Sequence, residues 1–456
     1  MLLIAALCSC WFIAAMAQPD EPAVQFDTCS TLDAGSSIVG NQQLLDTAHS
    51  AILFELNTNT MVYSWNPDQS VDPSGMNKIM TALLALEQGD LEDQVLVSNV
   101  ALSSVEIGAL TVGLAVGEEM TLEDLLYCMM VGSANDAAAV IAEHIAGGQA
   151  AFVDLMNQKA VEIGCTNTVF MNPSGLSHEN QRTTARDLAK ITAAALEQEE
   201  FLRFFSATEH TVAATNKSQE RALVTTNHMM TTETMGNFFD ERVTGGKTGA
   251  FTTTDRSLIC TAQSGDAKYL SVVMSAQGEK GTTTSPYANF RETSVLLEQG
   301  FSKFSSRRLL TSDLVLERFE VTNGENDLAV SASSEVHVMM PKDMNEADLT
   351  YRCIKTDAGV SAPISAGQVV GTVQVWYGSL CVTQGELVAM HGVAQPGTYN
   401  VAVEKTPLAT DDASSSNTAI TIILIPVGLI LVIGIVIILY RKRNRNAYRK
   451  QGKRRR

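Results

Sequence analysis

The chain has 456 residues, which is long enough for two or three domains with a sizeable core. Hydrophobic residues make up 45% of it and charged residues 18%, and only 11 residues are proline, which excludes wholesale disorder and a collagen-like repeat. The net charge of −18 argues against nucleic-acid binding, so we expect no nucleic-acid partner.

The N-terminus has the features of an export signal. Residues 2–17 are mostly apolar and end in Ala15-Met16-Ala17, which matches a small-residue cleavage site. We therefore predict a signal peptide at 1–17, followed by an N-terminal lead-in at 18–47. No Lys or Arg precedes the apolar run, so an uncleaved signal anchor is the alternative.

The segment 48–306 is predicted to form one mixed α/β domain. Runs of β-branched residues predict strands, and apolar residues at i and i+4 predict helices. A further helix is expected to begin after Thr121, which suits the N-cap position with Asp124 three residues later. The other predicted elements are strands at 51–56, 61–65, 257–262 and 269–274 and helices at 78–87, 136–145, 151–163 and 291–304.

The segment 307–405 is predicted to be a separate, small all-β domain. Its short strand-like runs lack helical periodicity, which is typical of a sandwich or barrel. Cys353 and Cys381 both lie here and are candidates for a disulfide, although spacing alone leaves the pairing open. The sequence has no C-x-x-C motif and its seven histidines are far apart, so we expect no metal site and no cofactor.

The C-terminal segment is predicted to cross a membrane. Residues 406–418 read as a polar linker, and the 22 uncharged residues of 419–440 would form a helix of roughly 33 Å. Residues 441–456 hold ten Lys or Arg and no Asp or Glu, which places this basic tail in the cytoplasm. We therefore expect a single-pass protein of the cell membrane with its N-terminal ectodomain outside. A buried core helix followed by a nucleic-acid-binding tail is the alternative.

Three short motifs occur in a fixed order along the predicted α/β domain. The first, Pro73-Ser-Gly-Met-Asn-Lys78, opens a helix. The second, Ser133-Ala-Asn135, begins 55 residues after Lys78, and the third, Lys247-Thr-Gly249, begins 112 residues after Asn135 and just before a predicted strand. This order resembles the S-x-x-K, S-x-N and K-T-G signature of the penicillin-recognising serine acyltransferases. Within them the chain resembles the low-molecular-mass penicillin-binding proteins of the D-alanyl-D-alanine carboxypeptidase family (peptidase S11), over residues 48–304 and more weakly beyond.

The resemblance implies a serine β-lactamase/transpeptidase-like α/β (α+β) fold that acts on peptidoglycan stem peptides ending in D-Ala-D-Ala. A serine at a helix N-terminus would attack the peptide carbonyl. Lys78 would act as its general base, Ser133 would pass a proton to the leaving D-alanine, and Asn135 would hold the substrate amide.

The third motif implies a substrate-binding strand. Lys247 and Thr248 would bind the terminal carboxylate, one by charge and one by its hydroxyl. Gly249 would let the substrate backbone lie against the strand. The N–H of Ala250 and the N–H of the nucleophile position would form the oxyanion hole.

The sequence departs from the family at the nucleophile. The residue three places before Lys78 is Gly75, which has no side chain and cannot form an acyl-enzyme. Ser74 is the possible substitute, but one residue along a helix is about 100° of rotation, which would turn its hydroxyl away from the site.

Three hypotheses follow from this departure. The first is a catalytically silent homologue that binds stem peptides in cell-wall metabolism. The second is an active carboxypeptidase that uses Ser74 or a substrate-bound water. The third is a non-enzymatic membrane scaffold whose basic tail recruits cytoplasmic partners or anionic lipid. A β-lactamase is less favoured because the sequence has no convincing E-x-x-L-N motif.

Overall fold

A computed structural model describes most of the chain between Cys29 and Gly397. The described residues are 29, 31–32, 35–40, 42–232, 238–250, 255–278, 287–356 and 360–397. The predicted signal peptide, linker, transmembrane helix and basic tail (1–17, 406–418, 419–440 and 441–456) lie outside them. Within the described ranges, no helix has the length and hydropathy needed to cross a membrane.

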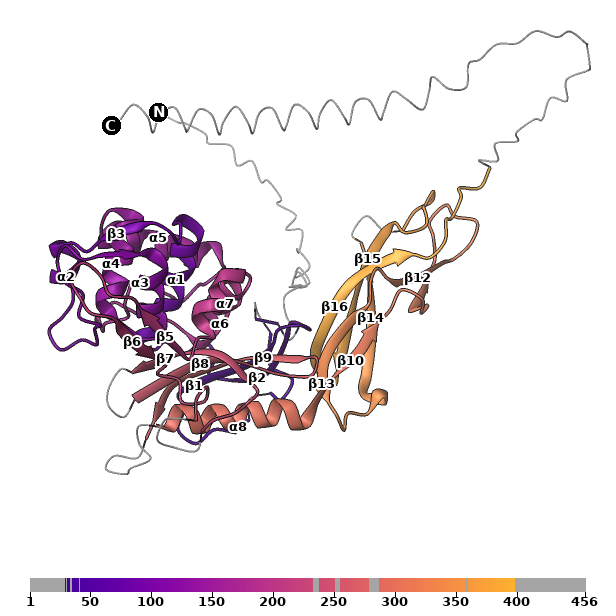
Figure 1. Cartoon of the computed structure of the whole chain (residues 1–456). Coiled ribbons are helices and arrows are strands. Elements are labelled where there is room, and N and C mark those ends of the chain that lie inside the picture. The colour runs from indigo at the N-terminus through magenta and orange to yellow at the C-terminus, as the bar shows by residue number, and fades with distance from the viewer. Residues whose placement is uncertain are drawn as a thin grey trace, which may run out of the picture. The chain divides into compact units, whose positions relative to one another are not determined.

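The first domain is built on a five-stranded antiparallel sheet with the strand order β2-β1-β9-β8-β7 (Figure 1). Its strands are β1 (Ser50–Glu55), β2 (Thr60–Trp65), β7 (Val243–Ala250), β8 (Asp255–Ser264) and β9 (Ala267–Gln277). The predicted strands at 51–56, 61–65, 257–262 and 269–274 are therefore confirmed. Lys247-Thr-Gly249 precedes the strand β8, as predicted, and itself lies within β7, at the edge of the sheet. The glycines of β7 lower its intrinsic propensity to form a strand, but main-chain hydrogen bonding to β8 outweighs this effect.

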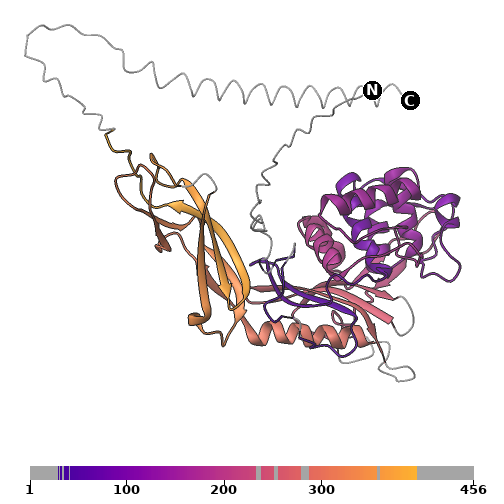
Figure 2. The ribbon, with the colours of Figure 1, turned by 180° about the vertical axis from the view of Figure 1, so that it is seen from behind.

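The two faces of the sheet are covered by different helices (Figures 1 and 2). Side chains alternate along β8, so Ile259 packs into the core under the N-terminal helices, whereas Leu258 and Cys260 pack into the core beneath α8 (Ala288–Lys303). This alternation matters for the site, because it sends neighbouring residues of β7 and β8 to opposite sides of the sheet edge.

The helices that apolar periodicity predicted in the N-terminal part of the domain are confirmed. Thr121 caps α3, since its side chain accepts a hydrogen bond from the Asp124 N–H. The sequence analysis did not predict α2, α6 or α7. The helical elements are η1 (Ser74–Met76), α1 (Asn77–Gln88), α2 (Asn99–Ser103), α3 (Leu122–Met130), α4 (Asn135–Ala146), α5 (Gln149–Glu162), α6 (Ala185–Leu196) and α7 (Glu199–Phe205). Short strand pairs join them, β3 (Gln94–Leu96) with β4 (Glu119–Thr121) and β5 (Glu209–Val212) with β6 (Arg221–Val224).

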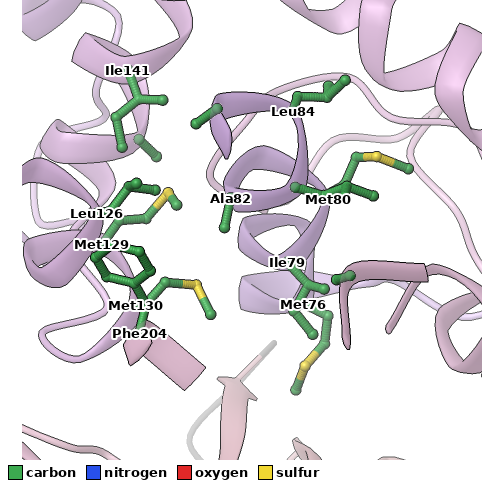
Figure 3. Close-up of a cluster of buried hydrophobic side chains, with 14 of the residues drawn as sticks. Met76, Ile79, Met80, Ala82, Leu84, Leu126, Met129, Met130, Ile141 and Phe204 are labelled. Carbon is green, nitrogen blue, oxygen red and sulfur yellow. The ribbon is translucent and has the colours of Figure 1, made fainter. Parts of the chain in front are cut away.

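Helix α1 is the central helix of this domain. All residues from Asn77 to Ala85 are buried, so α1 is enclosed on every side rather than amphipathic. Figure 3 shows Ala82 of α1 on the side that faces Leu126 and Met129 of α3, and Met80 on the opposite side of the helix. This close packing fixes the orientation of Lys78, one residue into the helix.

The second domain is β-rich, as predicted, over the described residues between Phe304 and Gly397. A five-stranded sheet of order β11-β12-β16-β15-β14 and a two-stranded sheet of β10 and β13 share one apolar core. The strands are β10 (Phe304–Leu310), β11 (Glu317–Phe319), β12 (Leu328–Ala332), β13 (Val336–Pro341), β14 (Leu349–Lys355), β15 (Val369–Tyr377) and β16 (Leu380–Ala389), with a short helix η3 (Glu346–Asp348) between β13 and β14.

A disulfide joins Cys29 of the lead-in to Cys381 on β16. The suggested pairing of Cys381 with Cys353 is wrong, and Cys353 is a free thiol. Cys353 lies on β14, and β15 separates it from β16, where the residue in line with Cys353 is Gly385 rather than Cys381. The two cysteines are therefore more than two strand spacings, or about 9.5 Å, apart. A disulfide tolerates Cα atoms only about 4.4–6.8 Å apart.

Candidate active site

A cavity of about 620 Å³ opens beside the edge strand β7. It is lined by η1, the start of α1, the turn between α3 and α4, and the end of β7. It therefore brings together most of the residues that the three motifs predicted. Those that line it are Gly75, Lys78, Ser133, Asn135, Thr248, Gly249 and Ala250.

Lys78 is enclosed at the base of this cavity. Its Nζ donates hydrogen bonds to the Asn135 Oδ1 at 2.7 Å and to the Ser174 carbonyl oxygen at 2.6 Å. Burial lowers the pKa of Lys78 well below its usual value, and the positive charge of Lys247 lowers it further. Lys78 is thus held as a base with a fixed orientation, but among the described residues its Nζ hydrogen-bonds to no hydroxyl group.

Lys247 lies behind the cavity wall rather than in the wall. Its side chain is fully buried, and its Nζ donates to the Ser133 Oγ at 2.9 Å and to the Thr248 carbonyl at 3.2 Å. Burial lowers the pKa of Lys247 to about 7. Lys247 does not line the cavity, so it reaches a ligand there through Ser133 and through its effect on Lys78.

Gly75 lies between β7 and Lys78. A Cβ atom at Gly75 would lie 3.0 Å from the Thr248 carbonyl oxygen and 4.0 Å from the Lys78 Nζ. A side chain at this position would therefore point at the lysine amine. With glycine, the cavity wall here is bare backbone.

Ser74 does not supply the side chain that is missing at Gly75. Its backbone has a positive φ of 44°, and its Oγ is buried, with no hydrogen-bond partner among the described residues. The Oγ packs against Gly249, where a Cβ atom would overlap it, and the Ser74 carbonyl packs even more closely against Gly175, where a Cβ atom would overlap the carbonyl oxygen. Ser74 is thus held between two glycines, and it does not line the cavity.

Asp136 supports the site, although no motif pointed to it. Its buried carboxylate accepts backbone N–H bonds from Val112, Gly113 and Leu114 at 3.0–3.2 Å. These bonds hold the loop before β4 close to α4, and the Asp136 charge offsets part of the drop in the Lys78 pKa. Only its place next to Asn135 in the sequence could have indicated this role.

The cavity continues past Thr248 to the α8 side of the sheet. Thr248 Oγ1 hydrogen-bonds to Thr226 Oγ1 there. Further residues line this part, among them His228, Arg256, Asn289 and Phe290, and the sequence analysis predicted none of these. They come from separate segments without a shared motif, so only the sheet pairing brings them together. Within the described ranges, no group of three His, Cys, Asp or Glu side chains gathers where it could hold a metal ion.

Comparisons with known proteins match this architecture. Residues 39–278 match the family D-alanyl-D-alanine carboxypeptidase (peptidase S11), and residues 304–395 match the penicillin-binding protein 5 C-terminal domain. The D-alanyl-D-alanine carboxypeptidase DacF of Bacillus subtilis is 30% identical over 336 residues, which cover 73% of this chain and 82% of DacF. DacC of Escherichia coli is 26% identical over 363 residues, covering 77% and 86% of the two chains.

The fold is similar to solved structures of the same kind. Penicillin-binding protein 5 from Haemophilus influenzae superposes with a TM-score of 0.62 at 26% identity, over 76% of this chain and 98% of that one. The match spans both the α/β domain and the β-rich domain that follows it. The chain therefore belongs to the D-alanyl-D-alanine carboxypeptidase family, peptidase S11.

Proposed function

We propose that this protein is a membrane-anchored, catalytically impaired member of the family, which binds peptidoglycan stem peptides ending in D-Ala-D-Ala without forming an acyl-enzyme. Relatives with the D-alanyl-D-alanine carboxypeptidase name supply the substrate class. The cavity supports peptide binding, because it presents Asn135, Thr248 and the β7 main chain along one edge.

The observation that carries the proposal is the position of Gly75. In a serine acyltransferase the nucleophile needs a base within hydrogen-bond reach. Here the base is in place, since a Cβ atom at Gly75 would lie 4.0 Å from the Lys78 Nζ, but Gly75 carries no hydroxyl. Acylation is therefore lost, whereas the groups that would hold a peptide are retained.

The burial of Ser74 argues against its use as a substitute. To reach Lys78, its Oγ would have to leave the contact with Gly249 and cross the η1 turn. A displacement of about 1 Å already costs roughly a hundredfold in rate. An enzyme based on Ser74 would need a different η1 backbone.

Anchoring in the membrane is proposed from the sequence. The apolar segment 419–440 and the basic tail 441–456 together favour one span with the cavity-bearing domains outside the cytoplasm. In this orientation the cavity faces the compartment that contains peptidoglycan.

The test is a calorimetric titration of the full-length protein with a synthetic pentapeptide ending in D-Ala-D-Ala, combined with an assay for released D-alanine. We expect saturable binding and no release of D-alanine. Ser74→Ala should bind the peptide as the wild type does. Release of D-alanine that disappears in Ser74→Ala would contradict the proposal, and so would the absence of binding.

A further inference from the structure

The segment that contains β3, α2 and the loop before β4 exposes several large apolar side chains. Of the fifteen that are strongly exposed among the described residues, five lie between positions 96 and 116. They are Leu96, Val100, Ile107, Leu110 and Val116. Single exposed apolar side chains are ordinary on a protein surface, but a group of them within one short segment marks a contact site.

Three of these side chains lie on neighbouring stretches of backbone. Leu96 is the last residue of β3, and α2 begins three residues later, with Val100 at its second position. The Gly117 N–H donates a hydrogen bond to the Val97 carbonyl at 2.8 Å. Leu96 and Val116 each lie one residue from this hydrogen bond. We call Leu96, Val100 and Val116 the β3–α2 patch; they are 62%, 70% and 52% exposed.

The backbone under the patch is held firmly. The Ser98 Oγ caps α2 by accepting the Ala101 N–H at 2.9 Å, and it donates to the Glu143 carboxylate on α4 at 2.6 Å. Ala101 is buried in the core, and α2 packs on α4 at the outside of the helix cluster (Figure 1). A fixed segment that presents apolar side chains to solvent is preorganised for binding.

The charge of this part of the chain has one sign. Residues 79–158 hold twelve Asp or Glu and no Lys or Arg. Two of these carboxylates flank the patch, since Glu119 pairs with Leu96 across the β3–β4 ladder and Glu143 accepts the hydrogen bond from Ser98. Neither forms an ion pair with a described residue. The patch therefore has an acidic rim.

Basic residues of the β5–β6 hairpin do not neutralise this rim. Arg221 forms an ion pair with the buried Glu118 at 2.7 Å, so its charge is already matched. Lys217 lies near Gly117, where a Cβ atom would be 3.6 Å from the Lys217 Cε. It supplies one positive charge against the two carboxylates of the rim.

An apolar patch with an acidic rim favours one kind of occupant. An anionic membrane surface or a nucleic acid would be repelled. A second copy of the chain is disfavoured, because outside its basic tail the chain has 22 Lys or Arg against 50 Asp or Glu. A protein surface on which Lys or Arg surround apolar side chains is complementary in both respects.

We infer that the β3–α2 patch docks a basic partner protein, which packs apolar side chains on Leu96, Val100 and Val116 and places basic side chains near Glu119 and Glu143. None of the three patch residues lines the cavity beside β7. The inference therefore does not depend on whether that cavity binds a peptide or forms an acyl-enzyme.

The test uses a defined probe, a fluorescent peptide of about 15 residues with Leu at helical spacing and Lys at the other positions. It is titrated into the full-length protein in zwitterionic nanodiscs, with empty nanodiscs as the blank. We expect saturable binding by fluorescence anisotropy. Acetylation of the lysines, or replacement of the leucines by serine, should each weaken the binding about tenfold.

Substitutions on the protein locate the binding. Leu96→Ser combined with Val100→Ser should weaken the probe about tenfold, and Glu119→Gln about threefold. Leu314→Ser and Glu325→Gln change exposed residues of the second domain and should leave the affinity unchanged. Urea unfolding of each variant verifies that the fold is intact.

Three results would overturn the inference and leave the proposed function standing. In the first, the affinity follows the peptide charge but not the Leu96 and Val100 substitutions, which would show only the general attraction of an acidic protein for a cation. In the second, the acetylated and free peptides bind equally well. In the third, the wild type sediments as a dimer and the double variant as a monomer, which would make a second copy the occupant.

Discussion

The Lys78 cluster and the η1 turn border the same cavity but differ in how their polar groups are used. In the cluster, Lys78 and Lys247 both donate hydrogen bonds, to Asn135 and to Ser133 respectively. In the η1 turn, Gly75 offers no side chain, and the Ser74 Oγ is buried without a partner among the described residues. The Lys78 cluster thus has the arrangement of an acyltransferase site. The η1 turn presents no hydroxyl group to the cavity that could act as the nucleophile.

Under the proposed function, binding and acylation depend on separate parts of the cavity. The cluster is held by α1, α4 and β7, which the buried core fixes regardless of what occupies position 75. The loss of one side chain on η1 can therefore remove the nucleophile without disturbing the groups that would hold a peptide.

Gly75→Ser should restore covalent reaction with penicillin. The new Oγ would lie near the Lys78 Nζ, after the Thr248 carbonyl shifts by a few tenths of an ångström to admit the Cβ atom. We expect an acyl adduct in the intact mass spectrum and a gain in acylation rate on the order of a thousandfold or more. Gly75→Ala supplies the same Cβ without the hydroxyl and should form no adduct. An unreactive Gly75→Ser protein that is folded would mean that the cluster is not arranged for catalysis.

Asp136→Asn should destabilise the cluster side of the cavity. The substitution removes a buried charge that accepts N–H bonds from three residues of the loop before β4, and it places an amide donor opposite some of them. We expect a loss of about 2–4 kcal/mol in the free energy of unfolding, measured in urea. Asp154→Asn, at an exposed position on α5, serves as the matched control and should lie within about 0.5 kcal/mol of the wild type.

Gly249→Ala should destabilise the η1 side. Its Cβ atom would overlap the Ser74 Oγ and lie 3.1 Å from the Met76 Cε. We expect a loss of about 1–3 kcal/mol from overpacking. Adding Ser74→Gly should recover part of it, because the overlapping hydroxyl is then gone. If the double variant is no more stable than Gly249→Ala, the packing assigned to Ser74 is wrong.

Lys247→Met should flatten the pH dependence of stability. The pKa of Lys247 is about 7 in the folded protein and 10.5 without burial, so the unfolded chain binds more protons between these values. Lys247 should therefore make wild-type stability rise with pH across this window, by up to about 1.4 kcal/mol per unit, in addition to the contribution of Lys78. Urea unfolding at pH 7, 8 and 9 should show a smaller slope for Lys247→Met and the wild-type slope for Lys217→Met. Equal slopes for all three proteins would contradict the burial of a titrating Lys247.

Local sequence patterns predicted the regular elements better than they predicted the cavity. The helix α1 and the Thr121 cap follow from spacing along the chain, which short-range physics determines. The three motifs also located one half of the cavity. Arg256 and Asn289 could not be predicted in the same way, because they meet only through strand pairing and the packing of α8.

Two other features needed the structure as well. The disulfide of Cys29 with Cys381 joins residues 352 positions apart, and no spacing rule encodes such a pair. The orientation of Ser74 depends on a positive φ and on close contact with Gly249, neither of which a helical projection includes. The helical projection also gave no indication that the Ser74 hydroxyl is buried.

The most direct test of a cavity that binds but does not acylate is the reaction of the wild-type protein with penicillin. The full-length protein should be incubated with a fluorescent penicillin and examined by intact-mass spectrometry and peptide mapping. We predict no stoichiometric covalent adduct. A stoichiometric adduct, above all one mapped to Ser74, would contradict the account, because it would show that the η1 turn supplies a nucleophile after all.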